Sequence, residues 1–200
     1  LLASHDIARD DTSGISNTLN GISAPAGTII DFVVDPKNED SSWDNTAFAA
    51  TITGDTATLD VPLYETTAVA NYRDAFQGPT PADGWQYLWN TDSTIGNASG
   101  YNAMLWTGSN YQSDSDPQRP DNPPASYLAL TASGGHPGET GSTDDVYAIA
   151  GYTVDADATY VLDGWISRGS GNGDGNELLA YVNDELVLLN WVLPGATLPL

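Results

Sequence analysis

The chain contains no cysteine, so neither a disulfide framework nor a thiolate metal site is available to it. Cationic side chains are also scarce: five Lys and Arg stand against 27 Asp and Glu, which gives a formal net charge of −22. This charge excludes a surface that follows nucleic-acid phosphates or an anionic membrane. We therefore expect no nucleic-acid partner, and favour a cation, a neutral glycan or another protein.

Long apolar runs are absent as well. No run approaches the ~18 to 20 residues needed to span a bilayer, so we expect no membrane insertion. The chain opens at Leu1 without a methionine or a signal peptide, which is typical of a mature or excised piece. Its surface has to be covered by Asp, Asn, Ser, Thr and Gly, a composition that suits a secreted or cell-surface protein in a calcium-rich or saline setting.

The sequence does contain the material for a sizeable β-rich core. It is 40% hydrophobic and has six Trp and ten Tyr, as expected for a globular protein. Segments with a period of two residues, rich in β-branched and aromatic side chains, predict strands. These segments are 28–34, 46–52, 57–63, 126–131, 146–154, 159–167, 177–182 and 185–193. Only a short turn within 65–76 has helical character, so the fold class is all-β.

Turn-forming residues separate the strands. The stretch "VNDEL" at 182–186 predicts a tight Asn-Asp hairpin, and "RGSGNGDGNE" at 168–177 a glycine-rich loop. Eight or so strands with long loops predict a β-sandwich of the jelly-roll type. The stretch 91–126 has little periodicity, and loops of this length are usually functional or held down by their own aromatic side chains.

Four stretches carry a resemblance: "YRDAFQGPTPADGWQYLWN" (72–90), "SYLALTASGGHPG" (126–138), "VYAIAGYTV" (146–154) and "GNGDGNELLAYVNDELV" (171–187). The chain resembles an uncharacterised module, similar to carbohydrate-binding jelly rolls, that occurs in tandem in large secreted bacterial proteins. The resemblance covers most of residues 70–190. It implies a jelly-roll-like fold and an extracellular setting, and it implies no particular activity.

The resemblance also reveals an unusual order of segments. In such modules a segment like "AGTIIDFVVDPKNEDSSWDNTAFAATI" follows the hairpin, whereas here it stands at 26–52, before the module begins. We therefore divide the chain into closing or donated strands (1–53), a joint (54–71) and a main module (72–200). Either residues 1–53 close their own sandwich, as in a circular permutant, or they close the sandwich of a neighbouring copy.

The second arrangement would build a chain of subunits. A sandwich that lacks strands exposes unpaired backbone groups, and a strand donated by another copy satisfies them by β-augmentation. If each copy both lacks and donates strands, the contact continues without closing and forms a filament. The apolar residues expected to enter the neighbour are Ile29, Phe32, Val34, Phe48 and Ile52.

Aromatic residues supply a candidate glycan site. Trp85, Trp89, Trp106 and Tyr101 could form a platform on which sugar rings stack, with Asp, Asn and Gln bonding the hydroxyl groups. The alternative is packing, because Trp85, Tyr87 and Trp89 alternate onto one face of a strand-like segment. We favour packing for this face, and we expect Trp165 and Trp191 to lie in the core or an interface.

Calcium is the one cofactor that the sequence suggests. Hard cations bind several Asp, Asn and backbone oxygens, and three loops within 35–45, 113–118 and 171–177 offer such clusters. Their alternative role is solubility. The candidate ligands for structural Ca²⁺ are Asp35, Asp40, Asp44, Asp114, Asp116 and Asp174.

Catalysis is not indicated. The chain has no G-x-S-x-G elbow, and its two histidines, His5 and His136, lie in unrelated contexts and cannot form a metal triad without Asp partners. We therefore expect no enzyme.

The triplet "NAS" at 97–99 marks Asn97 as a glycosylation candidate in the long loop.

Two functions remain. The first is a structural module, a repeat or subunit of a surface filament or long adhesin, joined head to tail by strand complementation with other copies of itself. The second is a carbohydrate-binding module that uses an aromatic platform to target a secreted protein to polysaccharide.

Overall fold

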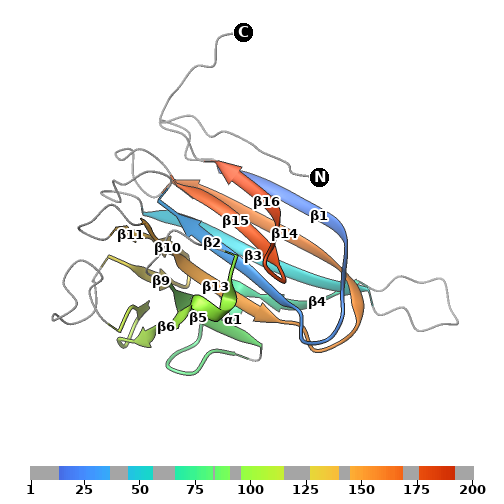
Figure 1. Ribbon diagram of the computed structural model, residues 1–200, viewed down its shortest axis with the longest axis horizontal. Helices are drawn as coiled ribbons and strands as arrows, with labels where there is room; N and C mark the ends of the chain where they lie inside the picture. The colour runs from blue at the N-terminus through green and yellow to red at the C-terminus, as the bar shows by residue number, and fades with distance from the viewer. Residues whose placement is uncertain are drawn as a thin grey trace, which may run out of the picture.

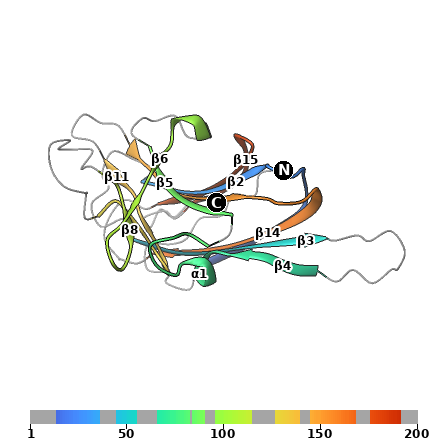
Figure 2. The same cartoon turned by 90° about the horizontal axis from the view of Figure 1, so that it is seen from below.

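Two antiparallel β-sheets packed face to face make up the fold, as the two views in Figures 1 and 2 show. This computed structural model describes residues 14–36, 45–55, 66–82, 84–90, 96–114, 127–139, 145–168 and 176–191. The predicted all-β sandwich is confirmed. The predicted strand at 57–63 lies outside the described residues.

The first sheet has eight strands in the order β1-β14-β3-β10-β9-β8-β7, with β4 pairing to β3. Their bounds are β1 (Ile15–Ala24), β3 (Thr46–Asp55), β4 (Thr66–Asn71), β7 (Leu105–Trp106), β8 (Tyr111–Gln112), β9 (Ala129–Thr131), β10 (Gly134–His136) and β14 (Ala158–Arg168).

The second sheet has six strands in the order β16-β15-β2-β13-β5-β6. Their bounds are β2 (Ile29–Asp35), β5 (Trp85–Trp89), β6 (Asn102–Ala103), β13 (Ala148–Thr153), β15 (Glu177–Val182) and β16 (Glu185–Trp191). A two-stranded ribbon, β11 (Gly138–Glu139) with β12 (Asp145–Val146), stands apart. The helical elements are α1 (Tyr72–Ala75) and the 3₁₀ turn η1 (Ala98–Gly100).

The main core lies between the two sheets and is rich in aromatic rings. Every second residue of β2 and β3 points into it, as the period-two pattern predicts. Large buried members are Phe32, Phe48, Tyr72, Trp85, Tyr87, Leu128, Leu130, Tyr160, Leu162 and Ile166. A second, smaller cluster consists of Val33, Tyr147, Ile149, Leu179 and Tyr181. Val33 lies between Phe32 and Val34 on β2, so its side chain points to the opposite face of the second sheet.

The N-terminal strands close the sandwich of their own chain. β2 lies between β13 and β15, and β3 pairs with β14 along its length. Of the residues expected to enter a neighbouring copy, Phe32, Val34, Phe48 and Ile52 are buried within this chain, and Ile29 is half-buried. Exchange of these strands with a second copy stays a prediction. The expected boundary between residues 53 and 54 falls inside β3, so the first strands and the later module share one pair of sheets.

The hairpin between β15 and β16 has the predicted Asn-Asp turn. Asn183 and Asp184 both have positive φ, 46° and 65°, as a type I′ turn requires. Asn183 also fastens β2, because the Ile29 amide donates to its Oδ1 at 3.2 Å. The turn thus joins the N-terminal and C-terminal parts of the chain.

Most of the predicted strands lie close to strands of the structure. The helical turn predicted within 65–76 is also present, as α1. Strand β1 was not predicted because its sequence, ISNTLNGISA, offers few apolar residues. Among the described strands it pairs with β14 alone. No helix in the described segments is long and apolar enough to cross a membrane.

Candidate functional site

The short helix α1 carries two polar side chains, Arg73 and Asp74, and Asn71 caps its N-terminus. Asn71 precedes the helix in an extended conformation, and its side chain accepts a hydrogen bond of 3.2 Å from the Asp74 amide. This is the usual role of Asn at a helix N-cap. The Asn71 Nδ2 also donates to Thr51 Oγ1 at 3.1 Å, which ties the cap to β3. Arg73 and Asp74, the next residues of the helix after Tyr72, are exposed.

Trp165 lies on the outer face of the same sheet. On β14 the buried residues Leu162 and Ile166 point into the core, whereas Trp165 shares the opposite face with exposed Asp163. Its register partner on the neighbouring strand β3 is the small residue Ala49. Gly14 approaches the indole so closely that a Cβ there would lie 2.5 Å from Trp165 Nε1.

These residues line an open hollow on the sheet. Its volume is about 410 Å³, and its lining comprises Ala49, Asn71, Arg73, Asp74 and Trp165. This volume lies within the range of ~300 to 1,000 Å³ that is typical of small-molecule sites. The hollow combines one aromatic ring with a guanidinium, a carboxylate and an amide.

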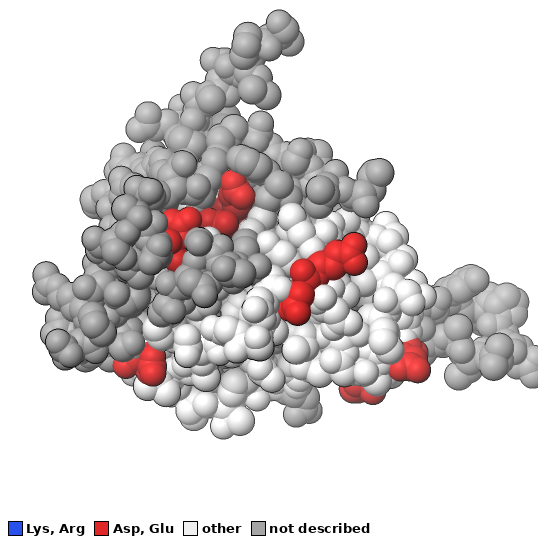
Figure 3. Space-filling view, viewed as in Figure 1, with Lys and Arg blue, Asp and Glu red and all other residues white. Residues whose placement is uncertain are grey.

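Arg73 is the notable charge in this hollow. It is the only Lys or Arg whose side chain the structure describes, and no ion pair joins it to another described side chain. Figure 3 shows acidic patches and no described Lys or Arg on the face that it presents. The guanidinium is therefore available as a hydrogen-bond donor to a ligand.

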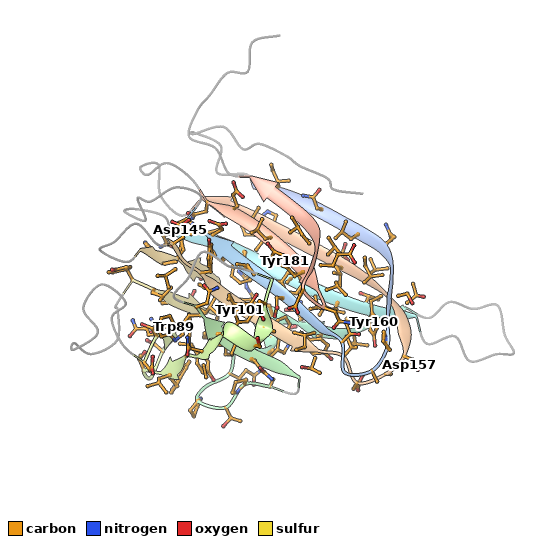
Figure 4. The ribbon with its side chains drawn as sticks, in the orientation of Figure 1. Trp89, Tyr101, Asp145, Asp157, Tyr160 and Tyr181 are labelled. Atoms are coloured by element: carbon orange, nitrogen blue, oxygen red, sulfur yellow. The ribbon has the colours of Figure 1, made fainter. Side chains whose placement is uncertain are left out.

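The expected aromatic platform is not assembled. Trp85 and Trp89 are only 4% and 3% exposed, so neither indole offers a face to a sugar, and the packing alternative holds for both. Trp106 is half-buried against Phe76 and Tyr111, with ring centroids 6.1 Å and 5.1 Å away. Tyr101 packs with the smaller cluster on the second sheet, whereas Trp89 belongs to the main core, although the two residues lie in the same region of Figure 4.

Only two of the six calcium candidates lie within the described residues. Asp35 is half-buried at the end of β2 and Asp114 is exposed on another loop, whereas Asp40, Asp44, Asp116 and Asp174 lie outside the described residues. Within the described part of the chain, no group of three or more His, Cys, Asp and Glu could hold a metal ion. These six residues stay a prediction.

The glycosylation candidate Asn97 is exposed and stands just before η1. Its Oδ1 accepts a hydrogen bond of 2.6 Å from Ser99 Oγ, so the two polar side chains of the triplet are in contact.

Sequence reasoning missed the residues that do meet, namely Asn71, Arg73, Asp74 and Trp165. One signal was present: strict alternation in "LDGWI" (162–166) places Trp165 on the face opposite Leu162 and Ile166. The hollow forms where α1, β3 and Trp165 of β14 come together, an arrangement of the tertiary structure that has no local signal.

Comparisons of the chain with protein-family models, with curated proteins and with solved structures find no match. The resemblance to a carbohydrate-binding-like jelly-roll module therefore stays a prediction, and the chemistry of the hollow must carry the functional argument.

Proposed function

We propose that this chain is a non-catalytic carbohydrate-binding module of a secreted or cell-surface protein, and that it binds glycans in the hollow beside Trp165. The observation that carries this proposal is the position of a half-buried indole next to Arg73, Asp74 and Asn71. Pyranose rings present an apolar C–H face that packs on a flat aromatic ring, and their hydroxyl groups bond to charged and amide side chains.

The charge of the chain favours neutral sugars. A net charge of −22 repels an acidic polysaccharide at long range, whereas it leaves a neutral one unaffected. Arg73 and Asp74 then serve as a donor and an acceptor for sugar hydroxyl groups rather than as partners of a charge.

The lining also favours binding over hydrolysis. Most glycosidases need a pair of carboxyl groups on either side of the scissile bond. Asp74 is the only carboxylate among the described residues that line the hollow. A site with one carboxylate holds a sugar without the acid and base that cleavage requires.

Affinity electrophoresis through gels that contain neutral or acidic polysaccharides tests the proposal. At least one neutral polysaccharide should retard the wild type, and Trp165→Ala should abolish that retardation while thermal unfolding shows a folded protein. Trp106→Ala is the matched control, because it removes an indole of the platform expected from the sequence and should leave binding intact. Loss of binding in Trp106→Ala alone would contradict the proposed site.

A structural role is a second candidate, favoured by the position of β1 at the edge of the first sheet as the structure describes it. This ten-residue strand contains no charge and no proline, and among the described residues it pairs only with β14. Such an edge is a template for pairing with another strand, and the bulge between Leu19 and Ile22 is the feature of β1 that opposes it. Head-to-tail joining of copies would use this edge or exchange of the N-terminal strands.

Electron microscopy of the purified protein distinguishes this candidate. Filaments with a regular repeat would support it, and the double variant Ser16→Lys/Asn20→Lys, at two exposed positions of β1, should prevent them if the edge is the joint. Filaments that persist in the variant would point to strand exchange. Discrete monomers at all concentrations would exclude the structural role.

A further inference from the structure

The edge strand β1 is interrupted by the pair Asn20–Gly21. The register of β1 with β14 shifts between Leu19 and Ile22. Asn20 and Gly21 stand opposite the single residue Val161, and neither has a register partner on β14, the described neighbour of β1. Two residues against one is the geometry of a β-bulge, which disrupts the ladder locally.

The bulge lies at the surface. Figure 1 shows β1 along one edge of the sandwich, and both Asn20 and Gly21 are exposed. Gly21 has a φ of 76°, in the left-handed region that glycine adopts without steric cost. A Cβ at Gly21 would meet nothing within 4 Å, so the space beside this backbone is open. Water and hydroxide can therefore reach the pair.

An asparagine that precedes a glycine can react with its own backbone. The main-chain nitrogen of Gly21, after it loses its proton to hydroxide, attacks Cγ of Asn20. The new N–Cγ bond closes a five-membered succinimide ring, the Cγ–Nδ2 bond breaks, and the side-chain nitrogen leaves as ammonia. Water then opens the ring at either carbonyl and gives aspartate or isoaspartate. Glycine favours the attack, because no Cβ shields its nitrogen and its backbone rotates freely.

A regular strand opposes this reaction. Ladder hydrogen bonds engage the amide groups and hold the backbone extended, so the nitrogen cannot turn toward the preceding side chain. Asn17 illustrates the regular case, since it lies three residues earlier in β1 and is paired with Gly164. The bulge relaxes both restraints at Asn20, within a strand that is paired on either side of it.

We propose that Asn20 is a site of spontaneous deamidation, at which the bulge of β1 converts a neutral side chain into a carboxylate through a succinimide formed with Gly21. The product carries the first charge on β1, whose ten residues contain none. A charge on an edge strand opposes pairing with a strand of another molecule. The reaction therefore changes the edge that a structural role would use, and it requires neither of the proposed functions.

The experiment is a time course of peptide mass mapping on the folded, full-length protein at pH 6 and pH 8. The peptide that contains Asn20 should gain about 1 Da, because an amide NH₂ is replaced by OH. Fragmentation should assign this gain to residue 20, and a protein isoaspartate methyltransferase should methylate the same peptide. The gain should be at least tenfold faster at pH 8, since attack requires the deprotonated nitrogen. Asn20→Gln should remove both signals, because its longer side chain closes a six-membered ring far more slowly.

Thr18→Gly is the matched control for the bulge. It changes an exposed residue and creates a second Asn-Gly pair, at Asn17, where β1 is paired with β14. In the same folded molecules, Asn20 should react at least tenfold faster than Asn17, and thermal unfolding verifies that the variant is folded. Equal rates at the two positions would overturn the proposal, because the bulge would then contribute nothing.

The folded wild type gives the second decisive result. The other Asn-Gly pair of the sequence, at 172–173, lies outside the described residues and is separated from Asn20 by peptide mapping. If residue 20 keeps its mass in the folded protein at pH 8 but reacts in the urea-unfolded chain, the folded bulge protects the pair and the proposal is wrong.

Discussion

The hydroxyl group of Tyr72 donates a hydrogen bond of 2.6 Å to the main-chain carbonyl oxygen of Thr131. Tyr72 is wholly buried, and burial raises its pKa well above the ordinary value for tyrosine. This hydrogen bond connects α1 to β9. The ring of Tyr72 packs against that of Phe48 in β3, with the two ring centroids 4.5 Å apart. The helix that carries Arg73 and Asp74 is thus held by a residue between the sheets.

Tyr72→Phe should lower the free energy of unfolding by about 1 to 2 kcal/mol, because the ring remains and the Thr131 carbonyl loses its donor. Tyr72→Ala should cost about 3 to 5 kcal/mol, since it also leaves a cavity. Urea unfolding of both variants measures these values. A Phe variant as stable as the wild type would show that the hydrogen bond contributes nothing.

Gly134→Ala should disrupt the pairing of β10 with β3. A Cβ at Gly134 would lie 1.9 Å from the Thr46 carbonyl oxygen, a contact that only a shift of the backbone relieves. Such overpacking costs about 1 to 3 kcal/mol or more. Gly100→Ala is the control, because nothing lies within 4 Å of its Cβ position, and its unfolding free energy should change by less than about 0.5 kcal/mol.

Asp31 should make the folded state less stable as pH rises. Its folded pKa of about 7 exceeds the ordinary value of 3.8, so the folded protein holds this proton more tightly than the unfolded chain. Ionisation of this carboxyl group contributes no cost below about pH 4, and the ionisation cost grows until the pH passes 7. Tyr101 and Tyr181 stay protonated over this range, because the ordinary pKa of tyrosine is already 10 and burial raises it further in both.

Asp31→Asn removes this cost. In the presence of a chelator, its free energy of unfolding relative to the wild type should increase by up to about 4 kcal/mol between pH 4 and pH 8. Chemical unfolding of both proteins across this range gives the difference. A difference that is constant with pH would mean that Asp31 ionises normally.

Asn183→Ala should weaken the closure of the N-terminal strands on their own chain. Asn183 has a φ of 46°, and its Oδ1 accepts the Ile29 amide. We expect a loss of about 1 to 3 kcal/mol from the strained backbone and the broken bond. Asn183→Gly should recover the backbone part only, so a glycine variant no better than alanine would contradict the role assigned to the turn.

Local pattern predicted much of the sandwich, for physical reasons. Alternation in β5 placed Trp85 and Trp89 on one buried face, and the Asn-Asp pair defined the β15–β16 turn. Strand β1 was not predicted, because an edge strand with few apolar residues lacks the signal of a buried one. The proposed glycan site depends on α1 and Trp165 of β14 lining the same hollow, an arrangement of distant segments that periodicity does not encode.

The most direct test of the glycan site is a two-dimensional NMR titration of the six indole Nε1–H signals with a neutral oligosaccharide. The signal that disappears in Trp165→Ala identifies Trp165. We predict that this signal shifts most on adding a fragment of the polysaccharide that retards the wild type. Shifts confined to another indole, such as that of Trp106, would contradict a glycan site beside Trp165.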